Sequence, residues 1–313
     1  MKSAFITGFS GFVGRHLTTY LHGLDWRVAG SDLRPVSSPQ GVAGISAFYR
    51  ADINDRAMLR QAFRETRPDV IFHLAGVIKS DTPDKYYQAH VLGTVALLDA
   101  VVESGSRPVV FIASSSAVYG SGLGSRPITE QFKPRPATHY GVSKLAQELA
   151  ALHYFTSFGL PVLLVRTFNL LGPGLSPQLA CSDFARQIAM AERNGTPSTI
   201  STGNLSARRD FVDVRDAVRA YVRLAENGRA GQAYNVASGQ AVPIRECLDF
   251  LREQAKVRVD AAVDPARVQT DDIPVQAGSI KRLQTATGWE LEYSKEQSLL
   301  DMLEDWRQRV KRE

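Results

Sequence analysis

Three side chains in the first half of the chain have the types and spacing that proton transfer to a carbonyl oxygen requires. Tyr140 and Lys144 lie four residues apart in "HYGVSK", so they would be neighbours on one helix face, and Ser115 falls within the run "PVVFIASSS". An ammonium group beside a phenol lowers the pKa of the phenol, so Tyr140 would exchange a proton near neutral pH during hydride transfer. Lys144 would supply that charge and hold the nicotinamide ribose, while the Ser115 hydroxyl would donate to the carbonyl oxygen. The three residues predict a catalytic group for carbonyl reduction or its reverse.

A glycine-rich stretch near the start of the chain is the expected cofactor cradle. "GFSGFVG", residues 8–14, has the spacing G-x-x-G-x-x-G, follows the apolar run "SAFIT" and opens a predicted helix. Glycines at these positions let the backbone approach a pyrophosphate, and the helix N-terminus offers free N–H groups and partial positive charge. The contacts predicted in this stretch are Gly8, Ser10, Gly11, Phe12, Val13 and Gly14.

The ends of the later β-rich runs carry residues suited to the nucleoside parts of the same cofactor. Asp32 stands eighteen residues after Gly14, close to the spacing at which a carboxylate accepts hydrogen bonds from an adenosine ribose. Arg34 would pair with a 2′-phosphate, although Asp32 would repel that phosphate. NAD is therefore the expected cofactor, and NADP stays open. The further expected cofactor contacts, besides Tyr140 and Lys144, are Asp52, Ile53, Leu74, Ala75, Gly76, Ser114 and Phe168.

Short β-rich runs alternate with helical stretches over the first 170 residues. Strands are predicted over 3–7, 26–32, 46–52, 69–76, 108–116 and 161–169, and helices over 12–22, 55–65, 85–104 and 140–157. Nearly continuous Val, Ile and Phe in these runs indicate strands covered on both faces, and the alternation indicates right-handed crossovers in a parallel sheet. We predict an α/β fold with a Rossmann-type doubly wound parallel sheet over residues 1–170. A smaller α/β C-terminal lobe over 171–313 would bind substrate, with some crossing of the chain between lobes.

Composition narrows the class of protein. The chain has 313 residues, 44% of them hydrophobic, and contains no apolar run of the length that a bilayer requires. Its net charge is +5, but acidic and basic residues are interleaved, which favours no nucleic-acid or membrane partner. Cys181 and Cys247 have no metal-type spacing, so neither a disulfide framework nor a metal site is expected. The expectation is a cytoplasmic protein whose positive excess suits an anionic ligand.

Taken together, these motifs resemble the extended short-chain dehydrogenase/reductases of the NAD-dependent epimerase/dehydratase family, which act on nucleotide sugars. The resemblance covers nearly the whole chain and includes "HLAG", "SSSAVYG", "FNLLGPG" and "RRDFVDVRD" besides the cradle and the Tyr-Lys pair. It implies that Asn169 and Arg209 contact the diphosphate of a nucleotide-sugar substrate. It also implies a homodimer formed through helices 85–104 and 140–157. The expected substrate contacts are Ser115, Ser116, Tyr140, Asn169, Arg209 and Arg267.

Within that family the sequence bears on the choice of reaction. Members that eliminate water to make 4-keto-6-deoxy sugars carry an Asp-Glu pair after the catalytic hydroxyl residue, where this chain has Ser116 and Ala117, so a dehydratase is disfavoured. The C-terminal third resembles GDP-4-keto-6-deoxy-D-mannose reductases, with Arg267 as a second phosphate contact but Gln269 where those enzymes usually carry a basic residue. The leading expectation is a reductase of this type, and a nucleotide-sugar 4-epimerase is the alternative. A non-catalytic NAD-binding regulator is a third reading, disfavoured by the intact catalytic residues.

Overall fold

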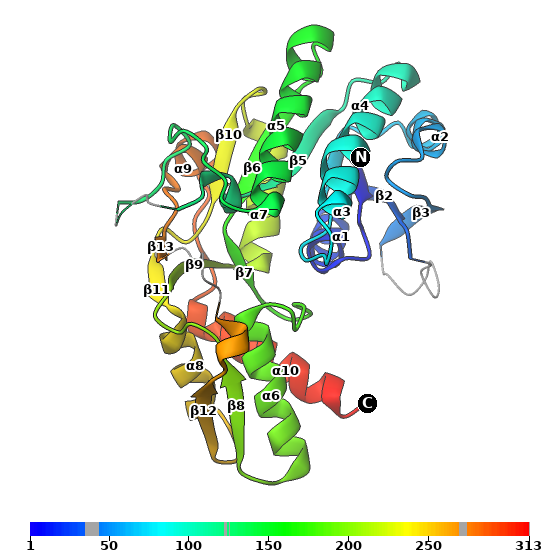
Figure 1. Ribbon diagram of the computed structural model, residues 1–313. Helices are drawn as coiled ribbons and strands as arrows, with labels where there is room; N and C mark the ends of the chain where they lie inside the picture. Colours follow the sequence, from blue (N-terminus) through cyan, green and yellow to red (C-terminus); the bar gives the residue numbers. More distant parts are fainter. Residues whose placement is uncertain (35–43, 122–123, 125, 269–273, 313) are drawn as a thin grey trace.

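The fold is a large α/β lobe above a smaller lobe that carries the C-terminus (Figure 1). A computed structural model describes residues 1–34, 44–121, 124, 126–268 and 274–312. The large lobe is built on a seven-stranded parallel sheet with the order β10-β6-β5-β4-β1-β2-β3. The strands are β1 (Ser3–Thr7), β2 (Arg27–Asp32), β3 (Ile45–Arg50), β4 (Val70–His73), β5 (Val109–Ser115), β6 (Val162–Thr167) and β10 (Ala233–Val236). This order confirms the predicted doubly wound sheet, with its point of reversal between β1 and β4.

Helices cover both faces of the sheet, as the apolar strands require. One face packs against α2 (Arg56–Thr66), α4 (Gly93–Ser104) and α5 (His139–Phe158). The other packs against α1 (Phe12–Gly23), α7 (Val214–Asn227) and α9 (Lys281–Thr287). Each face has its own core, because successive side chains of a strand point to opposite sides: Phe5 belongs to one core, and Ala4 and Ile6 to the other.

The helix predicted over 85–104 is divided into three segments. A short helix α3 (Asp84–Tyr87) leads into a π-helical turn (Gln88–Leu92), and regular α-helix resumes at Gly93. Thr94, in the first turn of α4 (Gly93–Ser104), donates its hydroxyl proton back to the carbonyl oxygen of His90 in the π turn, at 2.6 Å. Such side-chain bonds compete with the helical ladder and accompany its irregularities. The π turn places the His90 side chain beneath the catalytic helix α5, as described below.

The smaller lobe has its own core between α6 (Ala180–Asn194), α8 (Ile244–Glu253) and α10 (Lys295–Val310). Two small sheets complete it. The first joins β7 (Asn169–Leu171), β9 (Arg208–Asp213), β11 (Ala241–Pro243) and β13 (Val275–Gln276), and the second pairs β8 (Ser198–Thr202) with β12 (Val259–Val263).

The chain crosses between the lobes after residue 170. Strand β10 adds to the edge of the large sheet beside β6, and α7 and α9 pack on that sheet's face. Segments from 214–236 and 281–287 thus complete the first lobe, although they follow the predicted boundary. The division into units at residue 170 stays a prediction, and the crossing is what brings β9 beside β7 at the junction.

Candidate active site at the carboxyl edge of the sheet

The predicted glycine cradle lies between the ends of β1, β2 and β4. Gly8 has a φ of 67°, and a Cβ on it would meet the Cα of Ala75 at 2.8 Å. A Cβ on Gly14 would meet the carbonyl oxygen of Phe9 at 2.4 Å, so this glycine allows helix α1 to pack on the turn. Gly11 is the N-cap of α1, and no side chain of the described residues caps it. Uncapped N–H groups at a helix start fit an anionic group such as a dinucleotide pyrophosphate.

Asp32, at the end of β2, contacts the cradle directly. One of its oxygens accepts from the Ser10 hydroxyl at 2.6 Å and from the Ser10 backbone N–H at 3.1 Å. The other accepts from the Arg34 backbone N–H, and the Arg34 guanidinium lies 3.8 Å away on an exposed side chain. Hydrogen bonds thus hold the carboxylate that is predicted to bind the ribose, and an exposed guanidinium lies close to it. The Asp32 carboxylate, which favours NAD, and the Arg34 guanidinium, which would pair with the 2′-phosphate of NADP, therefore lie next to each other.

The remaining strand ends place their predicted residues in different ways. Asp52 is exposed, and one of its carboxylate oxygens accepts hydrogen bonds from the backbone and side chain of Asn54, which closes a local turn. The side chain of Ile53 lies against Gly93 of α4. Leu74 packs on the core below α1, whereas Gly76 is exposed and lies against His90 and Lys144. Gly76 therefore joins the cofactor edge to the catalytic helix.

The three consecutive serines at the end of β5 have separate roles. Ser114 is buried and its hydroxyl donates to the Glu148 carboxylate at 2.5 Å. Ser116 is also buried, and its side chain and carbonyl oxygen bond the Gln276 amide at 3.1 and 3.0 Å. Ser115, between them, accepts from the backbone N–H of Ala117 at 3.2 Å, and its side chain lies near enough to Tyr140 to affect the pKa of that phenol. The alternation of a strand thus directs only Ser115 of the three towards the predicted catalytic tyrosine. The side chain of Ser116 is turned to β13, so its predicted substrate contact would need its backbone.

Tyr140 lies among aromatic rings at the start of α5. The rings of Tyr86 and His90 meet it edge to face, at centroid distances of 5.9 and 5.6 Å. Burial raises the pKa of Tyr140, and the nearby Ser115 side chain opposes that rise. The expected lowering of this pKa by Lys144 is therefore wrong, because desolvation of the phenol outweighs the other effects.

Lys144 is buried one helical turn from Tyr140, and its amine is bound on the side of the core. Nζ donates to the carbonyl oxygen of Ala113 at 2.8 Å and to the Gln147 side-chain oxygen at 3.1 Å. Burial lowers the pKa of Lys144 to about 7, and the negative charge of Glu148 acts against that shift. Glu148 is itself paired with Arg166 of β6 at 2.7 Å, and both side chains are buried. This pair anchors the catalytic helix to the sheet.

The predicted substrate contacts at the lobe junction are held by backbone groups. The Asn169 amide donates to the carbonyl oxygen of Asp210 at 3.0 Å, which links β7 to β9. Arg209 projects from β9, and its guanidinium donates to the carbonyl oxygen of Arg208. Phe168 is buried against Tyr119 and Gly278, so the cofactor contact predicted for it rests on its backbone.

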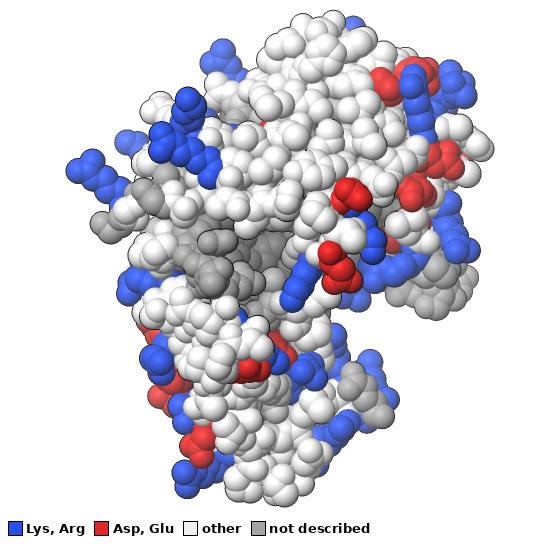
Figure 2. Space-filling view, in the orientation of Figure 1, with Lys and Arg blue, Asp and Glu red and all other residues white. Residues whose placement is uncertain are grey.

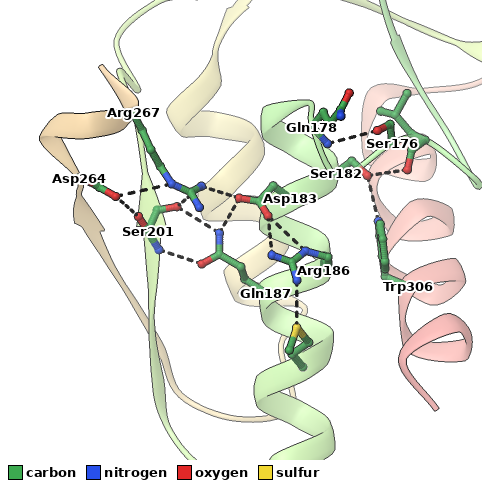
Figure 3. A network of polar contacts seen from close by, with 12 residues as sticks. Ser176, Gln178, Ser182, Asp183, Arg186, Gln187, Ser201, Asp264, Arg267 and Trp306 are labelled. Atoms are coloured by element: carbon green, nitrogen blue, oxygen red, sulfur yellow. Dashed lines mark hydrogen bonds and ion pairs between the residues drawn. The ribbon is translucent and has the colours of Figure 1, made fainter. Parts of the chain in front are cut away.

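Arg267 belongs to a polar network inside the smaller lobe (Figure 3). It ends the 3₁₀ turn η4 (Pro265–Arg267), and its guanidinium donates to Asp183 of α6 at 2.6 Å and to the carbonyl oxygen of Ser201 at 3.2 Å. Asp183 also accepts from Arg186 and Gln187 of the same helix. The Arg267 side chain remains 42% exposed, so a cation is held at a defined place while part of it faces solvent.

Charge on the visible face is mixed, with blue and red side chains interspersed and the outline notched between the two lobes (Figure 2). Within the part of the chain that the structure describes, no cluster of three His, Cys, Asp or Glu side chains is arranged to hold a metal ion. None of the described helices is long and apolar enough to cross a membrane. Gln269, the departure noted in the sequence, lies outside the described residues.

Sequence reasoning missed the buried polar residues beneath the catalytic pair, namely His73, His90, Thr94 and Gln147. Each is fully buried and hydrogen-bonded to another member or to a residue of the site. The signal for Gln147 was present, since it follows Lys144 by three positions and shares its helix face. The histidines had no such local signal, because their partners lie on other elements.

Comparisons with known proteins identify the family and fold of the chain. The model of the NAD dependent epimerase/dehydratase family matches residues 4–237. The GDP-6-deoxy-D-mannose reductase of Pseudomonas aeruginosa is 36% identical over 99% of this chain and 98% of its own. The structure of RMD from Pseudomonas aeruginosa complexed with NADPH superposes with a TM-score of 0.87, at 35% identity over 99% of this chain and 100% of that one. UDP-glucose 4-epimerase 4 of Oryza sativa is 28% identical over 96% of this chain and 89% of its own.

The fold and site define a Rossmann-type, nicotinamide-dependent oxidoreductase of the short-chain dehydrogenase/reductase class. The chain belongs to the NAD dependent epimerase/dehydratase family. The residues at the carboxyl edge fit a dinucleotide: an uncapped helix start, a glycine into whose place a Cβ would not fit, and a carboxylate fixed beside them.

Proposed function

We propose that this protein reduces the 4-keto group of a nucleotide-diphosphate 4-keto-6-deoxyhexose, of the GDP-4-keto-6-deoxymannose type. The observation that carries the proposal is the convergence of Ser115, Tyr140 and Lys144 at the sheet edge beside the glycine cradle. The near full-length likeness to a GDP-6-deoxy-D-mannose reductase supports the choice of substrate. Asn169, Arg209 and Arg267 are the proposed contacts for the substrate diphosphate.

Each catalytic side chain has a separate task in this proposal. The bound nicotinamide supplies the hydride. Tyr140 donates its phenolic proton to the carbonyl oxygen as negative charge develops there, and the Ser115 hydroxyl donates a second hydrogen bond to the same oxygen. Lys144, when protonated, stabilises the tyrosinate that results and holds the nicotinamide ribose. Because burial raises the pKa of Tyr140, the protonated phenol is favoured, as an acid catalyst requires.

A C4 epimerase uses the same Tyr140 in both directions, and the likeness to a UDP-glucose 4-epimerase keeps it as the second candidate. Incubation with GDP-4-keto-6-deoxymannose and NADPH or NADH should oxidise one cofactor for each sugar reduced. Incubation with UDP-glucose or GDP-mannose and no added reduced cofactor should leave the sugar unchanged. Appearance of the C4 epimer in the second assay, without cofactor turnover in the first, would replace the reductase with the epimerase.

We further propose a homodimer through α4 and α5. These adjacent helices and the π turn before them expose Leu92, Val142 and Leu149, which are 57%, 39% and 61% accessible. A stripe of exposed apolar side chains on neighbouring helices is typical of a helical interface. Light scattering should give a mass near twice that of the 34.3 kDa chain, and Leu149→Asp should yield monomer. Cys181 and Cys247 both carry free thiols, which supports the proposal that the protein functions in a reducing compartment such as the cytoplasm.

A further inference from the structure

The Lys144 amine depends on one side-chain acceptor, and that acceptor has a fixed orientation. Its two hydrogen-bond acceptors are the Ala113 carbonyl oxygen and the Gln147 side-chain oxygen, at 2.8 and 3.1 Å. The first is part of strand β5. Gln147 is fully buried, so its amide has to satisfy both of its ends within the protein.

The orientation of the Gln147 amide follows from its other partner. Its nitrogen donates to the Thr94 hydroxyl oxygen at 2.8 Å, and Thr94 gives its own proton to the carbonyl oxygen of His90. The Thr94 oxygen can then only accept from Gln147 and from His73, whose Nε2 lies 2.8 Å away. An inverted amide would set two acceptors against each other at Thr94 and an NH₂ group against the ammonium of Lys144.

The proton positions continue to the cofactor edge. If His73 donates through Nε2, its Nδ1 accepts from the Thr7 hydroxyl at 2.8 Å, and Thr7 in turn accepts from the backbone N–H of Ala75 at 3.2 Å. The chain of bonds thus runs from the turn that packs against Gly8 to the amine of Lys144. Every member has one assignment of donor and acceptor.

Several titratable groups face Lys144 from the elements packed around it. His73 of β4 and His90 of the π turn are both held neutral, since burial lowers their pKa values to about 3 and about 2. Glu148 of α5 carries its charge in the pair with Arg166 of β6. Tyr140 lies one turn before on α5. The histidines are neutral, the charge of Glu148 favours the ammonium form although it is shared with an arginine, and the Gln147 side-chain oxygen adds a direct hydrogen bond to that form.

We propose that Gln147 is a positioning residue for the catalytic pair: its side-chain oxygen, oriented by Thr94, holds Lys144 in place and favours the protonated amine. The inference rests on the proposed function for the role of Lys144. Removal of the acceptor should let the amine lose its proton at lower pH, and a carboxylate at the same position should retain the proton to higher pH.

The test measures the pH dependence of NADPH binding, by fluorescence titration, in Gln147→Leu, Gln147→Glu and the intact protein between pH 6 and 10. If Lys144 must be protonated to hold the ribose, affinity falls as pH rises through its pKa. We expect the midpoint of that fall to move down by about one pH unit in Gln147→Leu and up by a similar amount in Gln147→Glu. At pH 6 the Gln147→Leu affinity should be within about twofold of the intact protein, because about half of the variant's amine is still protonated there.

Two further variants keep the outcome clear. Thr94→Val leaves Gln147 in place but removes the partner that orients it, so it should shift the midpoint in the same direction as Gln147→Leu and by less. It decides the question if Gln147→Leu does not fold. Gln308→Leu, on the exposed side of α10, is the matched control and should leave the pH midpoint of NADPH affinity unchanged.

Equal midpoints in the folded variants, or a loss of affinity that is the same at every pH, would overturn the proposal. Since the titration needs no sugar substrate, it is separate from the test of the proposed function. A Tyr140→Phe variant with normal turnover would overturn the proposed function and leave the Gln147 result standing on cofactor binding.

Discussion

The two lobes hold their functional side chains in opposite ways. At the sheet edge, the catalytic Lys144 and its supports are buried, and their hydrogen bonds join α5 to β5 and α4 of the large lobe. In the smaller lobe, the cation predicted to bind substrate is partly exposed and paired with Asp183. A buried network fixes geometry and proton positions, because an unmet donor there is costly. A half-exposed arginine in an ion pair keeps its charge and can exchange its carboxylate partner for a substrate phosphate.

The largest effect is expected from the catalytic edge. Tyr140→Phe removes the proton donor and should lower turnover by at least about a hundredfold while NADPH affinity changes little. Turnover is followed by cofactor absorbance, and affinity by fluorescence. Tyr87→Phe, on α3, removes a hydroxyl that meets His139 at 3.1 Å on the surface and serves as the control. Comparable losses of turnover in Tyr140→Phe and Tyr87→Phe would contradict the assignment of Tyr140 as the proton donor.

The buried histidines should make the stability of the large lobe sensitive to acid. The unfolded chain protonates His90 below about pH 6.5, whereas the folded protein holds its pKa at about 2, so stability is lost as pH falls below 6.5. At pH 5 this amounts to about 2 kcal/mol, which His90→Asn cannot lose because it does not titrate. Urea midpoints at pH 7.5 and pH 5 measure the difference. His153 is exposed, so the urea midpoint of His153→Asn should fall between pH 7.5 and pH 5 as much as that of the intact protein. An equal fall in His90→Asn would show that His90 is not held neutral in the folded protein.

A smaller effect, on substrate affinity, is expected from the second lobe. If Arg267 binds the substrate diphosphate, Arg267→Ala should raise KM by about tenfold or more, the value of one charge-assisted hydrogen bond, with little change in kcat. Arg258→Ala removes a cation from an exposed pair with Asp260 and should leave KM unchanged. An unchanged KM together with a lowered melting temperature in Arg267→Ala would make the Asp183 pair a structural contact and end the contrast between lobes.

The least effect concerns the choice of cofactor. Asp32→Ser removes the charge that opposes a 2′-phosphate, keeps a hydroxyl near Ser10 and leaves Arg34 in place. We expect the NADPH to NADH ratio of kcat/KM to rise about fivefold, as about 1 kcal/mol of relieved repulsion gives. A ratio that does not change would mean that the carboxylate acts only to fix the glycine cradle.

Local pattern was sufficient to predict much of the large lobe. Six of its strands and the cradle were read from apolar runs and glycine spacing, because those signals lie within a few residues of one another. The missing strand was β10, whose four residues join the sheet far along the chain. The helix predicted over 85–104 became three segments, since the π turn depends on contacts of His90 with Ser143 of α5 and Val77 beyond β4.

Local sequence is enough to specify the apolar runs of the parallel strands, the glycines of the cradle and the i, i+4 pair of Tyr140 and Lys144. These depend on covalent spacing and local backbone geometry. The tertiary structure decided which of three serines meets Tyr140, that burial raises the pKa of that tyrosine, and that Gln147 holds Lys144. It also paired Arg267 with Asp183, 84 residues away. Solvation and long-range partners arise only when distant elements pack, and they set the protonation on which the chemistry depends.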